Sequence, residues 1–401
     1  MHAFLKTFTL ATFVWLSACS NPQNWVRGNT HTHTLWSDGD AAPEQVIDWY
    51  PTNGYQFLVL SDHNTVQDHE RWFPVTEGGR LTPAHLDELR ARFGPEAVEL
   101  RAVEGGGQEM RLRTLPELRA MFERGGFLLI TGEEVTDAYA RKPVHINAMN
   151  IASLIEPSGG GSVGEVIQNT LDAVAAHGAA HGRPALAHVN HPNFGWGIEP
   201  SDFFELRGEL FFEVYNGHRS VRNEGDEDHP SLEELWDTVL IARHTRGLSP
   251  LYALATDDAH SHRDPDGHSV PGRGWVMVRV EDLTASSVIE SMKAGAFYAS
   301  TGVTLEDVWH SSTELGLSIR VEPGVTYTTE FIGAVYEEGS PAPIATVLHT
   351  TTDNPARYTR TGEELYVRAR VTSSAPHPRP YREGDRQQAW TQPVWYEPVT
   401  D

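Results

Sequence analysis

The 401-residue chain has 39% hydrophobic residues and a formal net charge of −24, a composition typical of a globular protein rather than a disordered one. After the N-terminus no apolar run approaches the roughly 18 to 20 residues that a membrane-spanning helix needs, and no Lys- or Arg-rich run offers a surface for a long nucleic acid. The length suits one domain of barrel size followed by a smaller one.

The first twenty residues, MHAFLKTFTLATFVWLSACS, contain one early Lys and a short apolar stretch before the sequence LSAC. This pattern resembles a bacterial lipoprotein signal, in which removal of residues 1–18 leaves Cys19 as the lipidated first residue. An ordinary secretory signal or a buried first strand is the alternative. Cys19 is the only cysteine, so a disulfide within the chain is excluded and lipid attachment gives the thiol a use. The sequence therefore predicts an exported protein, anchored through lipid alone to a bacterial membrane.

Two histidines stand two residues apart in the next segment, GNTHTHTLWSDG at 28–39. In an extended strand residues i and i+2 share a face, so the imidazoles of His31 and His33 can converge on one point. Asp38 follows five residues later. This spacing favours a metal site at the start of the folded body.

From about residue 25 to 300, strand-like and helix-like segments alternate, which is typical of a parallel sheet or a barrel of βα units. Short apolar runs that end in polar residues occur at 55–64, 126–136, 184–193, 209–217 and 251–260. Helical patterns occur at 43–49, 82–93, 115–124, 163–181, 231–244 and 284–293.

Two further regions interrupt or follow this alternation. Residues 66–126 look like an insertion of helices between two barrel strands. From 303 to 401 the segments are rich in Thr, Val and Tyr with turns at short intervals, which predicts a small C-terminal all-β domain.

His, Asp and Glu recur directly after the predicted strands, beyond Leu60, Thr131, Val189 and Ala255. In barrels of βα units, catalytic residues lie at these C-terminal strand ends. Such ligands suit Mn²⁺, Fe²⁺ or Zn²⁺, whereas the lack of any cysteine besides Cys19 excludes a thiolate zinc site. The candidate ligands are His31, His33, Asp38, His63, Glu134, His145, His191, Asp258 and His260.

These residues fall into motifs that resemble the PHP (polymerase and histidinol phosphatase) metallohydrolases, over roughly residues 27–302. The motifs are H-x-H-T with S-D-G at 31–39, S-D-H at 61–63, G-x-E at 132–134, His145, H-P at 191–192 and D-x-H at 258–260. The segments GEEVT, HINAMN, NHPN and YASTG look most like the branch that includes carbaryl-type hydrolases.

The resemblance implies an α/β fold, a distorted (βα)₇ barrel over residues 19–302 that holds two to three divalent ions. By this analogy Glu134 bridges two ions, the first also held by His31, His33 and Asp258. The second is also held by His145 and His191, and a third by Asp38, His63 and His260. Glu134, Asp258 and His191 are the residues expected to support catalysis through these ions.

Three pairs of residues leave the choice of ligand open. Two of the pairs are adjacent in the sequence, and adjacent strand residues point to opposite faces, so only one of each can enter the site. The G-x-E spacing favours Glu134 over Glu133, and D-x-H favours Asp258 over Asp257. The Pro and Asn that follow favour His191 over His188.

Adjacent divalent ions activate water and clamp the oxygens of an in-line displacement, so no Ser or Cys nucleophile is required. The sequence therefore predicts a hydrolase of small esters, foremost a phosphoesterase. Arg141, Lys142 and Arg273 are candidates for binding an anionic substrate through their positive charge. The alternatives are a carboxyl or carbamate ester hydrolase and a non-catalytic metal-binding lipoprotein.

Overall fold

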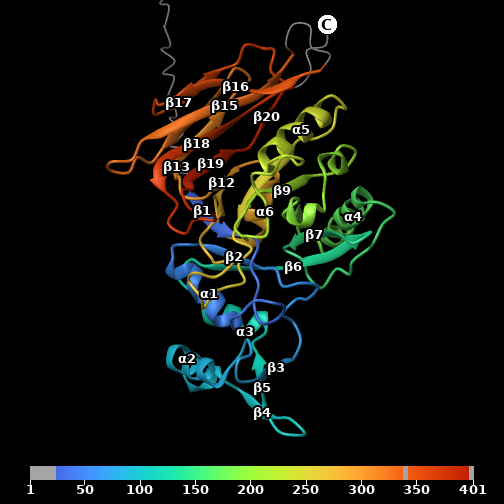
Figure 1. Cartoon of the computed structure of the whole chain (residues 1–401), viewed down its shortest axis with the longest axis vertical. Coiled ribbons are helices and arrows are strands. Elements are labelled where there is room, and N and C mark those ends of the chain that lie inside the picture. Colours follow the sequence, from blue (N-terminus) through green and yellow to red (C-terminus); the bar gives the residue numbers. More distant parts are fainter. Residues whose placement is uncertain (1–23, 337–341, 397–401) are drawn as a thin grey trace, which may run out of the picture.

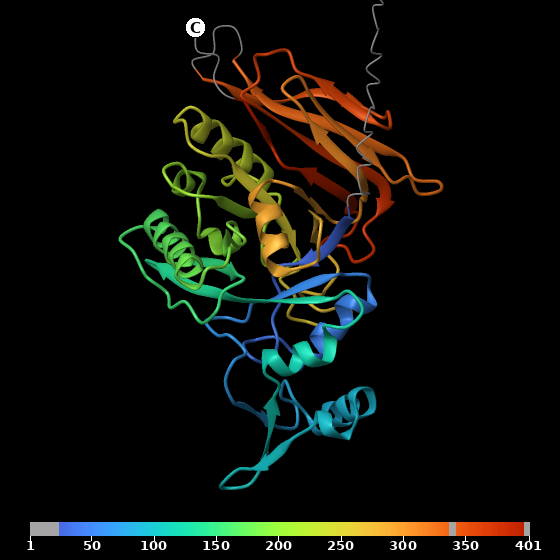
Figure 2. The same ribbon diagram turned by 180° about the vertical axis from the view of Figure 1, so that it is seen from behind.

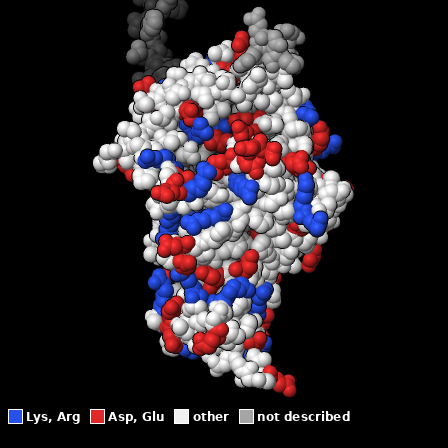
Figure 3. Space-filling model, viewed as in Figure 1, with Lys and Arg blue, Asp and Glu red and all other residues white. Residues whose placement is uncertain are grey.

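The computed structural model describes residues 24–336 and 342–396. The signal peptide and the lipidation site predicted at Cys19 lie outside these residues and stay predictions. None of the helices within the described ranges is long and apolar enough to cross a membrane. On the face drawn in Figure 3, Lys and Arg are interspersed with Asp and Glu rather than gathered in one patch.

All six helices expected from the sequence are present. The longest begins where the Ser162 side chain accepts a hydrogen bond from Glu165 N and ends at Gly182 in the left-handed conformation, the usual signals for the two ends of a helix. The helices are α1 (Pro43–Thr52), α2 (Pro83–Phe93), α3 (Leu115–Phe122), α4 (Val163–His181), α5 (Leu232–His244) and α6 (Ala285–Lys293). Three short 3₁₀ segments are η1 (Pro95–Ala97), η2 (Phe194–Trp196) and η3 (Pro200–Phe203).

One large sheet runs through the molecule, with helices packed beside it (Figure 1). Its first part contains β1 (Asn24–Asn29), β2 (Phe57–Leu60), β6 (Leu128–Tyr139), β7 (Lys142–Met149), β8 (Leu186–Val189), β9 (Leu210–Asn216), β10 (Leu251–Thr256), β11 (Trp275–Val280) and β12 (Phe297–Ser300). The spatial order is β10-β9-β8-β7-β6-β2-β1-β11-β12. The predicted α/β class is confirmed.

The sheet differs from a regular barrel of parallel strands. Strands β1, β2 and β6 are parallel to one another, and so are β8, β9 and β10. Strand β7 is antiparallel to β6 and β8, and β11 is antiparallel to β1. Strand β7 is antiparallel because Ala140 and Arg141, both with positive φ, form a two-residue hairpin between β6 and β7. The described strands do not close into a ring, so the expected (βα)₇ barrel is not confirmed.

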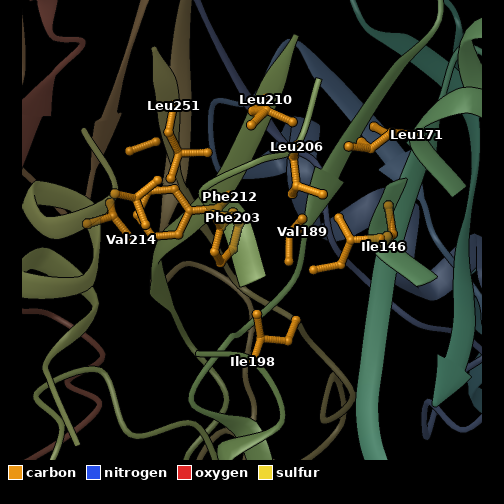
Figure 4. Packing of buried hydrophobic residues seen from close by; sticks show 14 of the residues in the cluster. Ile146, Leu171, Val189, Ile198, Phe203, Leu206, Leu210, Phe212, Val214 and Leu251 are labelled. Carbon is orange, nitrogen blue, oxygen red and sulfur yellow. The ribbon is translucent and has the colours of Figure 1, made fainter. Parts of the chain in front are cut away.

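The core of this region lies between β7, β8 and β9 and the helices that cover them. Figure 4 shows Ile146, Val189 and Phe212 from these strands close to Phe203 and Leu171. All five side chains belong to one buried apolar cluster. Burial of this cluster fixes the strands whose ends carry the polar residues described below.

The insertion expected to be helical at 66–126 is a mixed structure, so that expectation was wrong. Besides α2 and α3 it contains an antiparallel sheet of β3 (Arg71–Val75), β4 (Leu100–Ala102) and β5 (Gln108–Leu112). Alternating Met110 and Leu112 point into a core shared with Leu86 and Leu89 of α2. The insertion projects from one end of the molecule (Figures 1 and 2), and Trp36, from the segment after β1, packs into its core.

The last part of the chain is all strands between Leu305 and Trp395 in the residues described. Strands β13 (Leu305–His310), β14 (Glu314–Ile319) and β17 (Ala356–Thr359) form a separate sheet. The others are β15 (Tyr327–Val335), β16 (Ile344–Thr351), β18 (Tyr366–Pro376), β19 (Arg386–Thr391) and β20 (Val394–Trp395). Strand β19 pairs with β12, so β15, β16, β18, β19 and β20 continue the large sheet. A separate all-β domain that begins at residue 303 stays a prediction.

A buried carboxyl outside the polar strand ends gives a test of the fold by pH. Glu44, in the first turn of α1, is 1% exposed, and burial raises its pKa to about 7 although Arg113 lies 3.7 Å away. Between its ordinary pKa of 4.5 and 7, the folded chain therefore holds a proton that the unfolded chain has lost. Stability falls as pH rises through this window, by up to roughly 3 kcal/mol for this group.

Glu44→Gln is expected to remove this loss, so that the variant gains stability over wild type at pH 8 but not at pH 4. Urea unfolding at the two pH values measures the difference, with Glu290→Gln on the exposed side of α6 as the control. An equal effect of Glu44→Gln at both pH values would contradict the raised pKa.

Candidate metal centre

Nine imidazole and carboxylate side chains gather within or just beyond the strands β1, β2, β6, β7, β8 and β10. His31, His33 and Asp38 follow β1, and His63 follows β2. Glu134 and His145 lie within β6 and β7, His191 follows β8, and Asp258 and His260 follow β10. Two isolated bridges draw these ends together, Thr32 with Ala259 and His63 with Glu134.

Two of the nine residues have unusual backbone conformations. His191 has φ 29° and Asp258 has φ 47°, in the left-handed region that residues other than glycine rarely occupy. Such strain costs free energy and persists where the surrounding structure enforces it, often at functional sites. Here it turns both side chains into the same cluster.

Within the described residues the nine side chains form four overlapping groups whose candidate ligand atoms lie within 4.8 Å of one another. The groups share members, so the cluster is continuous. They are His33, Asp38, His63 and His260; His31, His33 and Glu134; His31, His191 and Asp258; and His63, Glu134 and His145.

Glu134 stands at the centre of the cluster, fully buried, and its two oxygens face different imidazoles. Oε2 lies 3.4 Å from His31 Nε2 and 3.3 Å from His33 Nε2. Oε1 lies 3.0 Å from His145 Nδ1 and 3.3 Å from His191 Nε2. Oε2 is buried and accepts no hydrogen bond of good geometry, which is costly for a carboxylate unless a cation satisfies it. The residues therefore fit bound divalent ions, with Glu134 placed between two groups of ligands.

Hydrogen bonds at the far side of two rings fix which nitrogen faces the cluster. His31 Nδ1 lies 2.7 Å from Glu213 Oε1, and His260 Nδ1 lies 2.9 Å from the Asp258 carbonyl oxygen. Since a carbonyl or carboxylate oxygen accepts, each ring in the neutral form that binds a metal ion carries its proton on Nδ1 and presents the Nε2 lone pair. This is the arrangement found around imidazoles that bind metals in proteins.

Glu213 was not predicted from the sequence. It is buried in β9 and also accepts hydrogen bonds from His191 N and the Thr256 hydroxyl. The signal was a single carboxylate within the apolar run LFFEVY, because a buried charge requires partners. Glu213 therefore orients two candidate ligands without joining the four groups.

The carboxylates and imidazoles of the cluster shift one another's pKa values. Burial alone would raise the pKa values of Glu134 and Asp258, but nearby imidazoles lower both well below their usual range. Burial would lower the pKa of His31, yet Asp258 and other carboxylates raise it. The pKa of His33 is lowered to about 3 by burial and by neighbouring imidazoles. Glu134 and Asp258 are thus ionised at neutral pH, as cation binding requires.

The three ambiguous pairs are resolved in space, with Glu134, Asp258 and His191 in the cluster. The Glu133 carboxylate instead accepts a hydrogen bond from Ile155 N. Asp257 Oδ1 accepts from the backbone of 272–274. His188 is buried, with Nδ1 3.9 Å from Glu213.

Two of the three cationic residues predicted to bind an anionic substrate, Lys142 and Arg273, have partners outside the cluster. The role predicted for Arg141, which is exposed, stays a prediction. Arg141 lies in the β6–β7 hairpin turn. Lys142 Nζ pairs with Glu199 at 2.7 Å. Arg273 is 1% exposed, and its Nη1 donates to the carbonyl oxygens of Gly217 and His268, which makes it a support for two loops.

Comparisons with known proteins give a distant likeness only. No family model and no curated protein matches the chain. Among solved structures, a two-domain protein from Bacteroides vulgatus ATCC 8482, containing a predicted PHP-like metal-dependent phosphoesterase, has 16% identity and a TM-score of 0.44, covering 88% of this chain and 91% of that one.

Two shorter structures match with lower scores. An amidohydrolase from Chromobacterium violaceum, with bound sulfate and no metal, has 17% identity and a TM-score of 0.32, over 67% of this chain and 96% of its own. A protein from Bifidobacterium adolescentis ATCC 15703, described as a metal-dependent phosphoesterase by assignment only, has 15% identity and a TM-score of 0.32. The match covers 66% of this chain and 94% of that one. These likenesses are too weak to decide the function, which rests on the site itself.

Proposed function

We propose that this chain is a metal-dependent hydrolase that cleaves small phosphate esters. The observation that carries the proposal is Glu134. One of its carboxylate oxygens faces the imidazoles of His31, His33 and His63, and the other faces those of His145 and His191. A carboxylate so placed suits two neighbouring divalent ions, Mn²⁺, Zn²⁺ or Fe²⁺ from the ligand types. Such ions lower the pKa of a bound water and neutralise the charge that develops on a phosphoryl group.

The protein's own residues hold and orient this site. Asp258 Oδ1 lies 3.2 Å from His31 Nε2 and 3.3 Å from His33 Nε2, so it would complete the group of ligands on that side of Glu134. His191 and His145 lie on the other side. His31, His33 and Glu134 are fully buried, whereas the side chain of Asp38 is 55% exposed, so the cluster reaches the solvent at Asp38.

The balance of charge favours an anionic substrate. Four carboxylates belong to the site or support it directly: Asp38, Glu134, Glu213 and Asp258. Two divalent ions would only offset these carboxylates, whereas a third, in the group that contains Asp38, would leave the site positive. No described Lys or Arg is hydrogen-bonded or ion-paired to any of the nine residues, and the chain carries −24 overall, so bound ions are the local source of positive charge. A phosphate dianion gains more from such a site than a neutral ester does.

A matched pair of nitrophenyl esters tests the substrate class. With Mn²⁺ or Zn²⁺ supplied, kcat/KM for the phosphate should exceed that for the acetate by at least about tenfold, roughly 1.4 kcal/mol of transition-state stabilisation. Inorganic phosphate should inhibit, and Asp258→Ala serves as the blank.

A tenfold preference for the acetate, with no inhibition by phosphate, would assign the site to carboxyl or carbamate esters instead. Binding of metal without hydrolysis of either ester above the blank would point to the non-catalytic alternative. The exported, lipid-anchored location remains a prediction from the sequence.

A further inference from the structure

His218 lies at the rim of the cluster and belongs to none of the four ligand groups. It follows β9 by two residues, and its ring centroid lies 5.4 Å from that of His260 and 6.4 Å from that of Phe194. Phe194 in turn packs against His191, with ring centroids 5.2 Å apart. The half-buried His218 ring thus stands between ligands contributed by two different strand ends.

The tautomer of His218 is opposite to that of the neighbouring ligands. Ser220 N donates a hydrogen bond to His218 Nδ1 at 3.2 Å. A backbone N–H can only donate, so Nδ1 is an acceptor and the neutral ring carries its proton on Nε2. His31 and His260 carry theirs on Nδ1 and present a lone pair. His218 is therefore built to present an N–H group, and none of the described residues accepts a hydrogen bond from its Nε2.

The loop that carries His218 is fixed to the cluster from both sides. Asn216 Oδ1 accepts from His218 N at 2.8 Å, while Asn216 Nδ2 donates to Asp258 Oδ2 at 3.1 Å. On the other side, Arg273 Nη1 donates to Gly217 O at 2.6 Å. A side chain at Gly217 would have its Cβ 2.7 Å from the Asp257 carbonyl oxygen, so the loop is closely packed. These contacts hold the donor in place before any substrate arrives, which is what electrostatic stabilisation of a transition state requires.

We propose that His218 Nε2–H donates a hydrogen bond to a non-bridging oxygen of the phosphoryl group of the substrate. This inference rests on the proposed function and adds a substrate-binding residue to it. It also gives Arg273 a role as a positioning residue, since Arg273 holds the carbonyl oxygen that precedes His218.

Two substitutions separate the donor from the bulk of the ring. His218→Phe keeps the volume and removes the N–H, whereas His218→Gln retains an amide N–H at a similar reach. We expect His218→Phe to lower kcat/KM for nitrophenyl phosphate by about 10²-fold, chiefly in kcat, and His218→Gln to stay within about tenfold of wild type. His181→Gln, at the exposed end of α4, is the control. All variants should bind as much metal as wild type.

Two readouts do not depend on turnover. In metal-free protein with ¹⁵N-labelled histidine, the His218 signals, assigned by their loss in His218→Gln, should show the Nε2–H tautomer. Calorimetry should show weaker binding of inorganic phosphate to metal-loaded His218→Phe than to metal-loaded wild type.

The possible failures are distinguishable. A His218→Phe variant as active as wild type, an Nδ1–H tautomer, or a loss of bound metal in His218→Phe would each overturn the role of His218. A wild type that hydrolyses neither ester would instead overturn the proposed function, and phosphate binding would still decide whether His218 contacts the anion.

Discussion

Replacing Glu134 with glutamine is expected to lower kcat/KM for a phosphate ester by on the order of 10³-fold, above the 10- to 100-fold typical of a residue that only supports a ligand. The side chain keeps its size but loses the charge and one of the two oxygens that face the imidazoles of His31 and His33 on one side and His145 and His191 on the other. The expected cause is fewer bound ions, so hydrolysis and metal content should fall together.

Glu133→Gln is the matched control for this experiment. Glu133 is adjacent and buried, but its carboxylate accepts a hydrogen bond from Ile155 N that a glutamine oxygen can also accept. Activity and metal content should therefore stay near wild type. A Glu134→Gln variant that matches Glu133→Gln in both measurements would contradict a bridging role for Glu134.

Replacing Arg368 with methionine is expected to cost about 3 to 5 kcal/mol of stability, because it removes the buried cation that pairs with two half-buried carboxylates. Arg368, on β18, is 1% exposed. It pairs with both oxygens of Asp237 on α5, at 2.8 and 2.7 Å, and with Glu233 at 3.1 Å. These contacts join α5 to the C-terminal strands, so their loss should loosen the attachment of the two parts.

Urea unfolding of wild type, Arg368→Met and Arg370→Met measures this effect. Arg370 also pairs with Glu233, but its side chain is 28% exposed, so its loss should cost about 1 kcal/mol or less. Equal losses for the two variants would show that burial of Arg368 does not matter.

The six helices could be predicted because each carries its own local signals, such as Ser162 before α4 and the pairing of Ser231 with Glu234 before α5. The antiparallel course of β7 could not. Its hairpin turn contains Ala140 and Arg141, neither of which is a residue typical of turns that need positive φ. The three-stranded sheet of the insertion was missed because its short strands are only partly apolar.

The candidate ligands could be proposed from the sequence because they recur after successive strands in motifs with fixed spacing. The residues that support them could not. Glu213 is hidden inside an apolar strand, and the use of Arg273 depends on two loops, at 217 and 268, that meet only in the folded chain. Partners distant in sequence decide such roles, and one sequence does not reveal the pairing.

The number of metal ions bound per chain tests the central claim most directly. Elemental analysis of the purified protein, loaded with Mn²⁺ or Zn²⁺ and freed of excess metal, should find two to three ions per chain in wild type and fewer in Glu134→Gln. Fewer than one ion per chain in wild type, or full hydrolytic activity in protein stripped of metal, would contradict a metal-dependent hydrolase built around Glu134.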